Sequence, residues 1–237
     1  MSSPVHSSRL IAATLLGLSA LPMSSHATII FTLDKCNSSS TWQACDQTVN
    51  FSPASSGTTV IGDTNPPKPD YQVFVEDLTG LTLHASGSSV DTGVHGPGFT
   101  SILITPEAGY AWGSIEFMLD SMDKDQLTGP GLTLTAIDQF DVKWIFNTNF
   151  PYEGDKGENQ HYSLHGLDGQ VITSLQIDYR DPDPACRTDP TQCNTINDIH
   201  NIDVGTQMVP EPGSLALFGA GLTLAGVSRR RLRQGRR

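Results

Sequence analysis

The chain has 237 residues and a formal net charge of −11, from 25 acidic and 14 basic side chains. The charge is uneven: residues 1–27 hold one arginine, residues 28–209 hold 24 acidic and 7 basic side chains, and residues 210–237 hold six arginines and one glutamate. The acidic centre excludes a nucleic-acid-binding domain, because phosphate contacts need clustered lysine and arginine. The length leaves room for one or two domains.

The N-terminal residues have the order of a secretory signal peptide. Arg9 supplies the positive start, and residues 10–21 form an apolar stretch of the usual length. Ser25 and Ala27 place small residues where a signal peptidase cuts, so we expect the secretion machinery to release the chain between Ala27 and Thr28. A retained membrane anchor is the alternative, but the stretch is shorter than the roughly 20 residues that a spanning helix needs.

The C-terminal residues hold three features in a fixed order. Pro210, Glu211 and Pro212 come first, and the prolines keep the backbone extended. Residues 214–227 follow as an apolar run, which can form one short transmembrane helix although it is below the usual spanning length of about 17–25 residues. A basic cluster ends the order, beginning with Arg229, Arg230 and Arg231. These arginines should stay cytoplasmic, so the acidic centre is expected outside the inner membrane.

Residues 209–237 resemble the PEP-CTERM sorting signal of Gram-negative bacteria, which joins a Pro-Glu-Pro motif, a short transmembrane helix and an arginine-rich end. The resemblance implies sorting by an exosortase, a membrane enzyme that cuts near the Pro-Glu-Pro motif. It also implies transient attachment to the inner membrane and a final place at the cell surface or in the extracellular matrix, often alongside exopolysaccharide and biofilm. Pro210, Glu211 and Pro212 would then be substrate residues for another enzyme.

Four cysteines lie in the acidic centre: Cys36, Cys45, Cys186 and Cys193. An exported chain with an even number of cysteines is expected to hold disulfides, and four cysteines allow three pairings. We favour the local pairs Cys36–Cys45 and Cys186–Cys193, each of which closes a short polar loop. A zinc site is the alternative, but the two intervals fit no common zinc pattern.

Short apolar stretches with a period of two, separated by Gly, Pro, Asn and Asp turns, predict β-strands between residues 28 and 205. The strand candidates are residues 28–33, 58–61, 71–75, 81–84, 101–105, 115–119, 132–137, 140–146, 160–164, 171–179 and 199–204. About ten strands fit one all-β domain, a β-sandwich or jelly roll. We therefore expect a signal peptide at 1–27, a β-sandwich body at 28–205, and a linker with the sorting signal at 206–237.

Two aspartate clusters are candidate calcium ligands. The first is Asp120, Asp123 and Asp125, and the second is Asp178, Asp181 and Asp183. Carboxylate oxygens on loops suit calcium, which exported proteins meet at high concentration. Neither cluster matches an EF-hand loop, whose glycine and final glutamate are missing at the right offsets. A solvated acidic loop that keeps the protein soluble is the alternative.

No motif of a known catalytic site is present in the body. His161 and His165 fall where a strand and a turn are predicted, so we expect exposed histidines there. Trp112 and Tyr110 are candidates for an exposed aromatic surface that could stack on sugars, whereas Trp144 is expected in the core. The leading hypothesis is a non-enzymatic surface or matrix protein without an obligatory cofactor. A carbohydrate-binding module and a secreted hydrolase with paired carboxylates are the alternatives.

Overall fold

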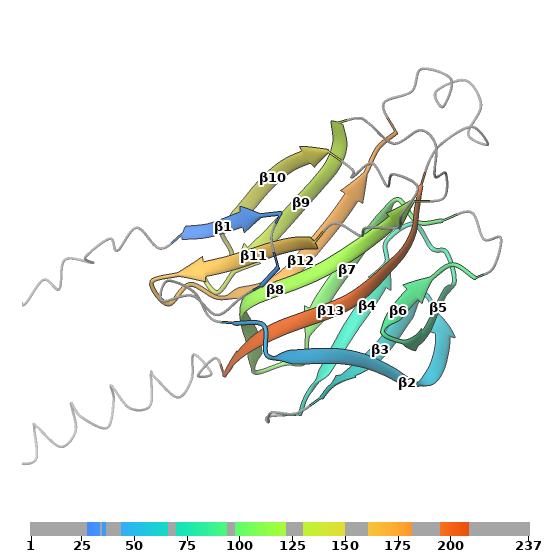
Figure 1. Ribbon diagram of the computed structural model, residues 1–237, viewed down its shortest axis with the longest axis horizontal. Helices are drawn as coiled ribbons and strands as arrows, with labels where there is room; N and C mark the ends of the chain where they lie inside the picture. Colours follow the sequence, from blue (N-terminus) through green and yellow to red (C-terminus); the bar gives the residue numbers. More distant parts are fainter. Residues whose placement is uncertain are drawn as a thin grey trace, which may run out of the picture.

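The computed structural model describes residues 28–33, 35–36, 44–65, 70–93, 98–121, 130–149, 161–181 and 195–208. Regular structure in these residues is entirely β and forms thirteen strands (Figure 1). The strands are β1 (Thr28–Thr32), β2 (Gln47–Gly57), β3 (Thr59–Thr64), β4 (Gln72–Asp77), β5 (Leu83–Gly87), β6 (Ser89–Asp91), β7 (Ser101–Pro106), β8 (Tyr110–Ser121), β9 (Pro130–Asp138), β10 (Lys143–Asn149), β11 (His161–Leu167), β12 (Ile172–Tyr179) and β13 (Ile196–Met208). The predicted all-β class is therefore confirmed.

All thirteen strands belong to one hydrogen-bonded sheet, in the order β1-β11-β8-β13-β6-β5-β2-β3-β4-β7-β12-β9-β10. Two further pairings, β13 with β2 and β8 with β12, close seven of these strands into a ring: β8, β13, β2, β3, β4, β7 and β12. The closure differs from the predicted β-sandwich, whose two sheets would not be joined by hydrogen bonds. Register shifts in β2 and β13 let these long strands bend from one neighbour to the next.

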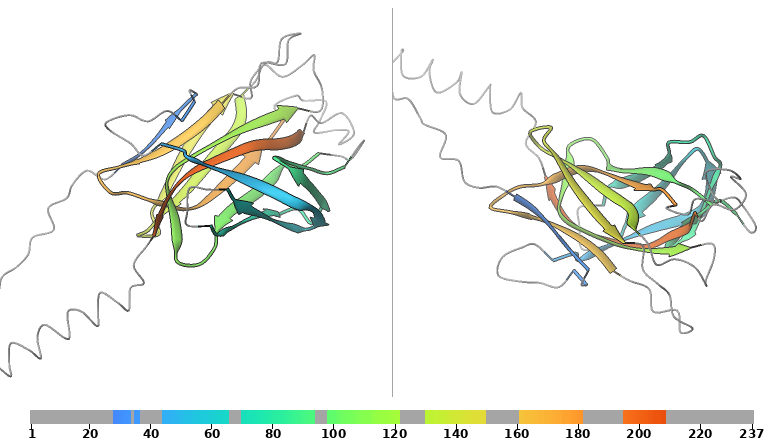
Figure 2. Two further views of the ribbon diagram at one scale, coloured as in Figure 1. Left: turned by 60° about the horizontal axis from the view of Figure 1, so that its bottom comes forward. Right: turned by 90° about the horizontal axis from the view of Figure 1, so that it is seen from above.

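Two strand pairs extend from the ring. The pair β1–β11 continues from β8, and the hairpin β9–β10 continues from β12. The two pairs lie opposite each other (Figure 2), with the rings of Phe31 and Phe146 packed at a centroid distance of 5.8 Å. Aromatic packing therefore closes the end of the core between these pairs.

The alternation of apolar residues identifies the inward face of two predicted strands, residues 115–119 and 171–179, correctly. Ile115, Phe117 and Leu119 of β8 are fully buried, as are Leu175 and Ile177 of β12. Side chains of this size contribute roughly 1.5–3 kcal/mol each when they are removed from water. The even spacing of these residues therefore accounts for both the strands and the core between them.

The predicted strand at residues 140–146 begins later than expected. Residues 139–142 form a turn, because the carboxylate of Asp138 accepts hydrogen bonds from the backbone N–H of Phe140 at 2.8 Å and of Val142 at 2.9 Å. Phe140 is 70% exposed and Val142 is 48% exposed, so they do not share a buried face with Trp144 and Phe146. Trp144 and Phe146 pack partly buried against the core, which corrects the prediction of a buried Trp144. A side-chain cap thus overrides the apolar alternation.

The last strand is longer than predicted. β13 continues to Met208, whereas the linker was expected to begin at Thr206. The end of β13 pairs with β8, and the Thr206 hydroxyl lies 2.8 Å from the hydroxyl of Tyr71. Side-chain contacts from outside β13 therefore hold residues that look like a polar linker in the sequence.

Several predictions fall on residues outside the described ranges. They concern the signal peptide and Ala27, the pair Cys186–Cys193, the cluster members Asp123, Asp125 and Asp183, and the sorting residues Pro210, Glu211, Pro212, Arg229, Arg230 and Arg231. The short transmembrane helix at 214–227 also stays a prediction. Within the described residues, no helix is long and apolar enough to cross a membrane.

Candidate functional site

The outward side of β8 and its neighbours brings several ionisable side chains close together. Since Ile115, Phe117 and Leu119 of β8 point inward, the residues between them point outward. Register pairs Asp203 of β13 with Glu116, and Asp198 of β13 with Asp120. We call this surface the polar face, and its members are Glu116, Met118, Asp120, His161, Asp198, His200 and Asp203.

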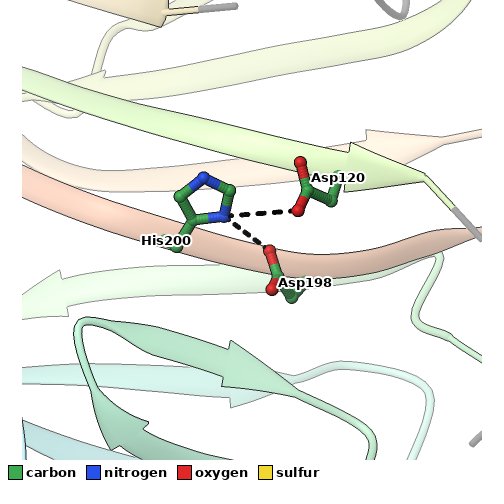
Figure 3. A group of neighbouring side chains, drawn as sticks. All are labelled: Asp120, Asp198 and His200. Atoms are coloured by element: carbon green, nitrogen blue, oxygen red, sulfur yellow. Dashed lines mark hydrogen bonds and ion pairs between the residues drawn. The ribbon is translucent and has the colours of Figure 1, made fainter. Parts of the chain in front are cut away.

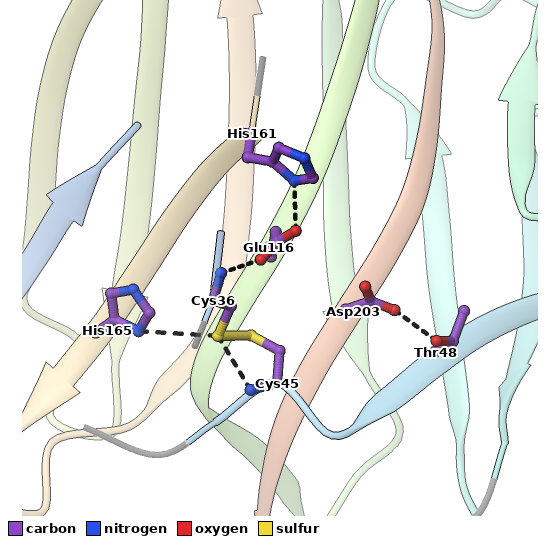
Figure 4. The surroundings of a disulfide bond; sticks show 7 residues. All are labelled: Cys36, Cys45, Thr48, Glu116, His161, His165 and Asp203. Carbon is purple, nitrogen blue, oxygen red and sulfur yellow. Dashed lines mark hydrogen bonds and ion pairs between the residues drawn. A yellow bond between two sulfur atoms is a disulfide. The ribbon is translucent and has the colours of Figure 1, made fainter. Parts of the chain in front are cut away.

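A pocket of about 320 Å³ opens on the polar face beside the Cys36–Cys45 disulfide. The disulfide, which Figure 4 shows with its surroundings, confirms the first of the two predicted pairs. The pocket is lined by Lys35, Cys36, Cys45, Thr48, Glu116, Met118, His161, Asn201 and Asp203. The two cysteines and β13, which are far apart in the sequence, thus line one pocket.

Glu116 is the most buried carboxylate in the lining of this pocket, with 5% of the residue exposed. One of its oxygens lies 2.5 Å from Nδ1 of His161, and the other accepts the backbone N–H of Cys36. A buried carboxylate is stable only when its oxygens have partners. The backbone at Cys36 therefore satisfies one of the two oxygens of Glu116.

Asp203 lies beside Glu116 on the neighbouring strand. Burial raises the pKa of Asp203, the hydrogen bond from the Thr48 hydroxyl at 2.6 Å opposes this rise, and the Glu116 carboxylate adds to it. Like charges directly opposite on neighbouring strands are destabilising. Two acidic groups of this kind can accept hydrogen bonds from ligand hydroxyls or exchange a proton.

His165 is not the exposed histidine that the sequence pattern predicts. The imidazole is buried, with Nδ1 4.0 Å from Sγ of Cys36, and burial lowers the pKa of His165 from 6.5 to about 4. The side chain is therefore neutral at pH 7. His161 is half-buried and bound to Glu116. The contact with Cys36 contributes to this difference, since nothing in the pattern of β11 indicates that the disulfide lies beside it.

Asp120 belongs to a second cluster on the polar face, with Asp198 and His200 of β13 (Figure 3). Nδ1 of His200 lies 2.7 Å from an oxygen of Asp198 and 3.8 Å from an oxygen of Asp120. One ligand atom from each residue lies within 4.8 Å of the others, and in the described part of the chain this is the only such group of three. The sequence pattern does not indicate Asp198 and His200 as partners of Asp120, because they lie about 80 positions further along the chain.

The second predicted calcium cluster is only partly described. Asp178 lies within β12 and not in a loop, and Oδ1 of Asp178 accepts hydrogen bonds from the Ser101 hydroxyl at 2.5 Å and the Gln176 amide at 3.0 Å. Asp181 follows the strand. The hydrogen bond from Ser101 links β7 to β12, which is a structural role.

The expected aromatic surface is not formed by Trp112 and Tyr110. Trp112 is fully buried and donates its indole N–H to the hydroxyl of Tyr71 at 2.8 Å. Tyr110 stacks on Tyr71 at a centroid distance of 4.5 Å. Both side chains therefore pack within the body, beside the end of β13, and offer no flat aromatic platform to a sugar.

Comparison with known protein families identifies a sorting motif at the C-terminal end. A model of the PEP-CTERM protein-sorting motif matches residues 209–233, and the match begins directly after β13 ends at Met208. No curated protein and no solved structure matches the chain. The motif indicates export and sorting through an exosortase toward the cell surface or the extracellular space. The C-terminal end of the chain thus carries a PEP-CTERM sorting motif, which implies processing by an exosortase, and the described part of the chain before it is all β.

Proposed function

We propose that the protein is a non-enzymatic component of the cell surface or extracellular matrix that associates with exopolysaccharide. The observation that carries the proposal is the position of the sorting motif, which starts at residue 209 while the last strand ends at Met208. Cutting near Pro210 and Pro212 would release the whole ring of strands and leave the arginine-rich end behind. The released product would keep all thirteen described strands in one sheet, as expected for a folded matrix protein.

Cell fractionation tests this proposal. The chain is followed in cells with and without the exosortase, and we expect it in the surface and matrix fraction of the first and in the membrane fraction of the second. Enzymatic removal of exopolysaccharide should then shift the protein from the matrix to the medium. The same distribution before and after polysaccharide removal would contradict the association with exopolysaccharide.

A second candidate function is direct carbohydrate binding in the pocket beside the disulfide. The pocket has the volume of a small-ligand site, roughly 300–1,000 Å³. Asp203, Thr48 and Asn201 supply polar atoms that can exchange hydrogen bonds with sugar hydroxyls. Because the described lining residues include no Phe, Tyr or Trp, recognition would rest mainly on hydrogen bonds and be weak.

A glycan array tests carbohydrate binding in the pocket, and a separate reducing-end assay tests the hydrolase alternative. Binding that is lost in Asp203→Asn and kept in the control Asp178→Asn supports the carbohydrate site. If the wild type produces new reducing ends from a glycan and Glu116→Gln does not, the protein is a hydrolase and the non-enzymatic proposal is overturned. Equal binding by the wild type and Asp203→Asn would remove the pocket from consideration.

A further inference from the structure

We propose that Asp120, Asp198 and His200 form a binding site for a divalent cation of the zinc type, which would tie β8 to β13. The site is distinct from the predicted calcium loops, because two of its three ligands lie on β13 and one of these is an imidazole nitrogen. It is independent of the pocket beside the disulfide, whose lining includes none of the three residues.

The spacing of the ligand atoms supports the proposal. Zinc binds carboxylate oxygens and imidazole nitrogens at about 2.0–2.2 Å, so neighbouring ligand atoms in an octahedral or tetrahedral site are about 2.8–3.6 Å apart. The distances from His200 Nδ1 to the two carboxylates, 2.7 and 3.8 Å, lie on either side of that range. Small side-chain rotations are therefore enough to place one cation between all three atoms (Figure 3).

The backbone holds the three residues in place. Asp120 and Asp198 are direct cross-strand partners, and His200 is two residues further along β13 on the same side. His200 is 9% exposed, which is unusual for an imidazole that faces the outer surface of a sheet. Asp198 is oriented by the Ser89 hydroxyl, which lies 3.2 Å from Oδ2 and leaves Oδ1 facing the histidine. Hydrogen bonds of this kind commonly orient metal ligands.

A further carboxylate adds negative charge next to the site. Asp91 of β6 is the cross-strand partner of Asp198, so Asp91, Asp198 and Asp120 lie side by side on three neighbouring strands. Like charges in such positions repel each other, and a bound cation reverses the sign of that interaction. The electrostatic field at His200 therefore favours a cation.

The ligand chemistry selects the type of metal. Calcium takes six to eight oxygen ligands at roughly 2.3–2.6 Å and does not favour imidazole. Imidazole with carboxylates suits zinc and neighbouring transition metals. Three protein ligands leave room for water at the remaining positions.

The test uses the full chain in detergent, freed of metal with a chelator and titrated with ZnCl₂, MnCl₂ or CaCl₂ in separate calorimetric and thermal-unfolding experiments. We expect one saturable zinc site that raises the unfolding temperature, and no comparable effect of calcium. His200→Gln and Asp198→Asn should each weaken zinc binding by more than about 10-fold. Even the loss of a residue that only hydrogen-bonds to a metal ligand commonly weakens binding by about 10–100-fold. Ser89→Ala should weaken it by about 10-fold.

A control variant separates this site from general surface binding. Asp178→Asn removes an aspartate of β12, which is not part of this cluster, so it should not change zinc affinity. Since zinc binding is read directly as heat, a variant that is less stable but folded still reports it. The proposal is overturned if zinc does not bind saturably, if His200→Gln and Asp198→Asn bind zinc as tightly as the wild type, or if calcium binds more tightly than zinc.

Discussion

Removing the Cys36–Cys45 disulfide should destabilise the body by an amount that follows from the size of its ring. The cysteines are nine residues apart, and a closed loop of about 10 residues lowers the unfolded-state entropy by the equivalent of about 2.7 kcal/mol at 25 °C. For a body of this length, each kcal/mol shifts the unfolding temperature by about 2–4 °C. The double variant Cys36→Ser/Cys45→Ser should therefore unfold about 5–11 °C below the wild type.

The measurement is thermal and urea unfolding of the wild type and the double variant without reductant. Reductant added to the variant reports only on Cys186 and Cys193, which separates the two predicted bridges. The Cys36 backbone N–H also partners Glu116, so the variant should in addition alter the environment of His161, which NMR of the imidazole detects. A loss below about 1 kcal/mol would refute the reasoning, because the segment would then be held in place without its covalent closure.

Three further predictions concern stability. Because burial lowers the pKa of His165 from 6.5 to about 4, the unfolded chain binds more protons between these values. The wild type should therefore lose stability as the pH falls from 6.5 toward 4, and the loss should be smaller in His165→Gln; identical pH profiles would contradict this. Trp112→Phe deprives the Tyr71 hydroxyl of its indole partner and should cost about 1–3 kcal/mol in urea unfolding, with faster amide exchange at the end of β13; unchanged stability would speak against this contact. Ile177→Ala should cost about 2–5 kcal/mol and the exposed Ile145→Ala within about 0.5 kcal/mol, and equal losses would show that the burial assignment is wrong.

Sequence patterns predict those parts of the fold in which the burial of a residue follows from whether it is apolar. The alternation of Ile115, Phe117 and Leu119 identifies both the strand and its inward face. The same reasoning fails at Phe140 and Val142, because the turn they belong to depends on one buried carboxylate that caps backbone N–H groups. The closure of the seven strands into a ring likewise depends on where long strands bend. The alternation of apolar and polar residues along a strand does not indicate these bends.

The candidate sites are harder to predict, because they depend on the register between distant strands. The sequence makes Asp120 a candidate calcium ligand because of its neighbours Asp123 and Asp125, whereas Asp198 and His200 come close to it only through the pairing of β8 with β13. The pairing of Glu116 with Asp203 has the same origin. By contrast, the sorting motif is contiguous, so its residue order alone is sufficient to identify it.

Processing at the sorting motif is the central claim, and the intact mass of the exported protein tests it most directly. The protein is isolated from the surface and matrix fraction of cells that contain the exosortase, and from the membranes of cells that lack it. We expect the first to have lost the apolar run and the arginine-rich end beyond Pro210–Pro212, and the second to retain both. A C-terminal arginine-rich peptide that stays attached in both samples would contradict the account.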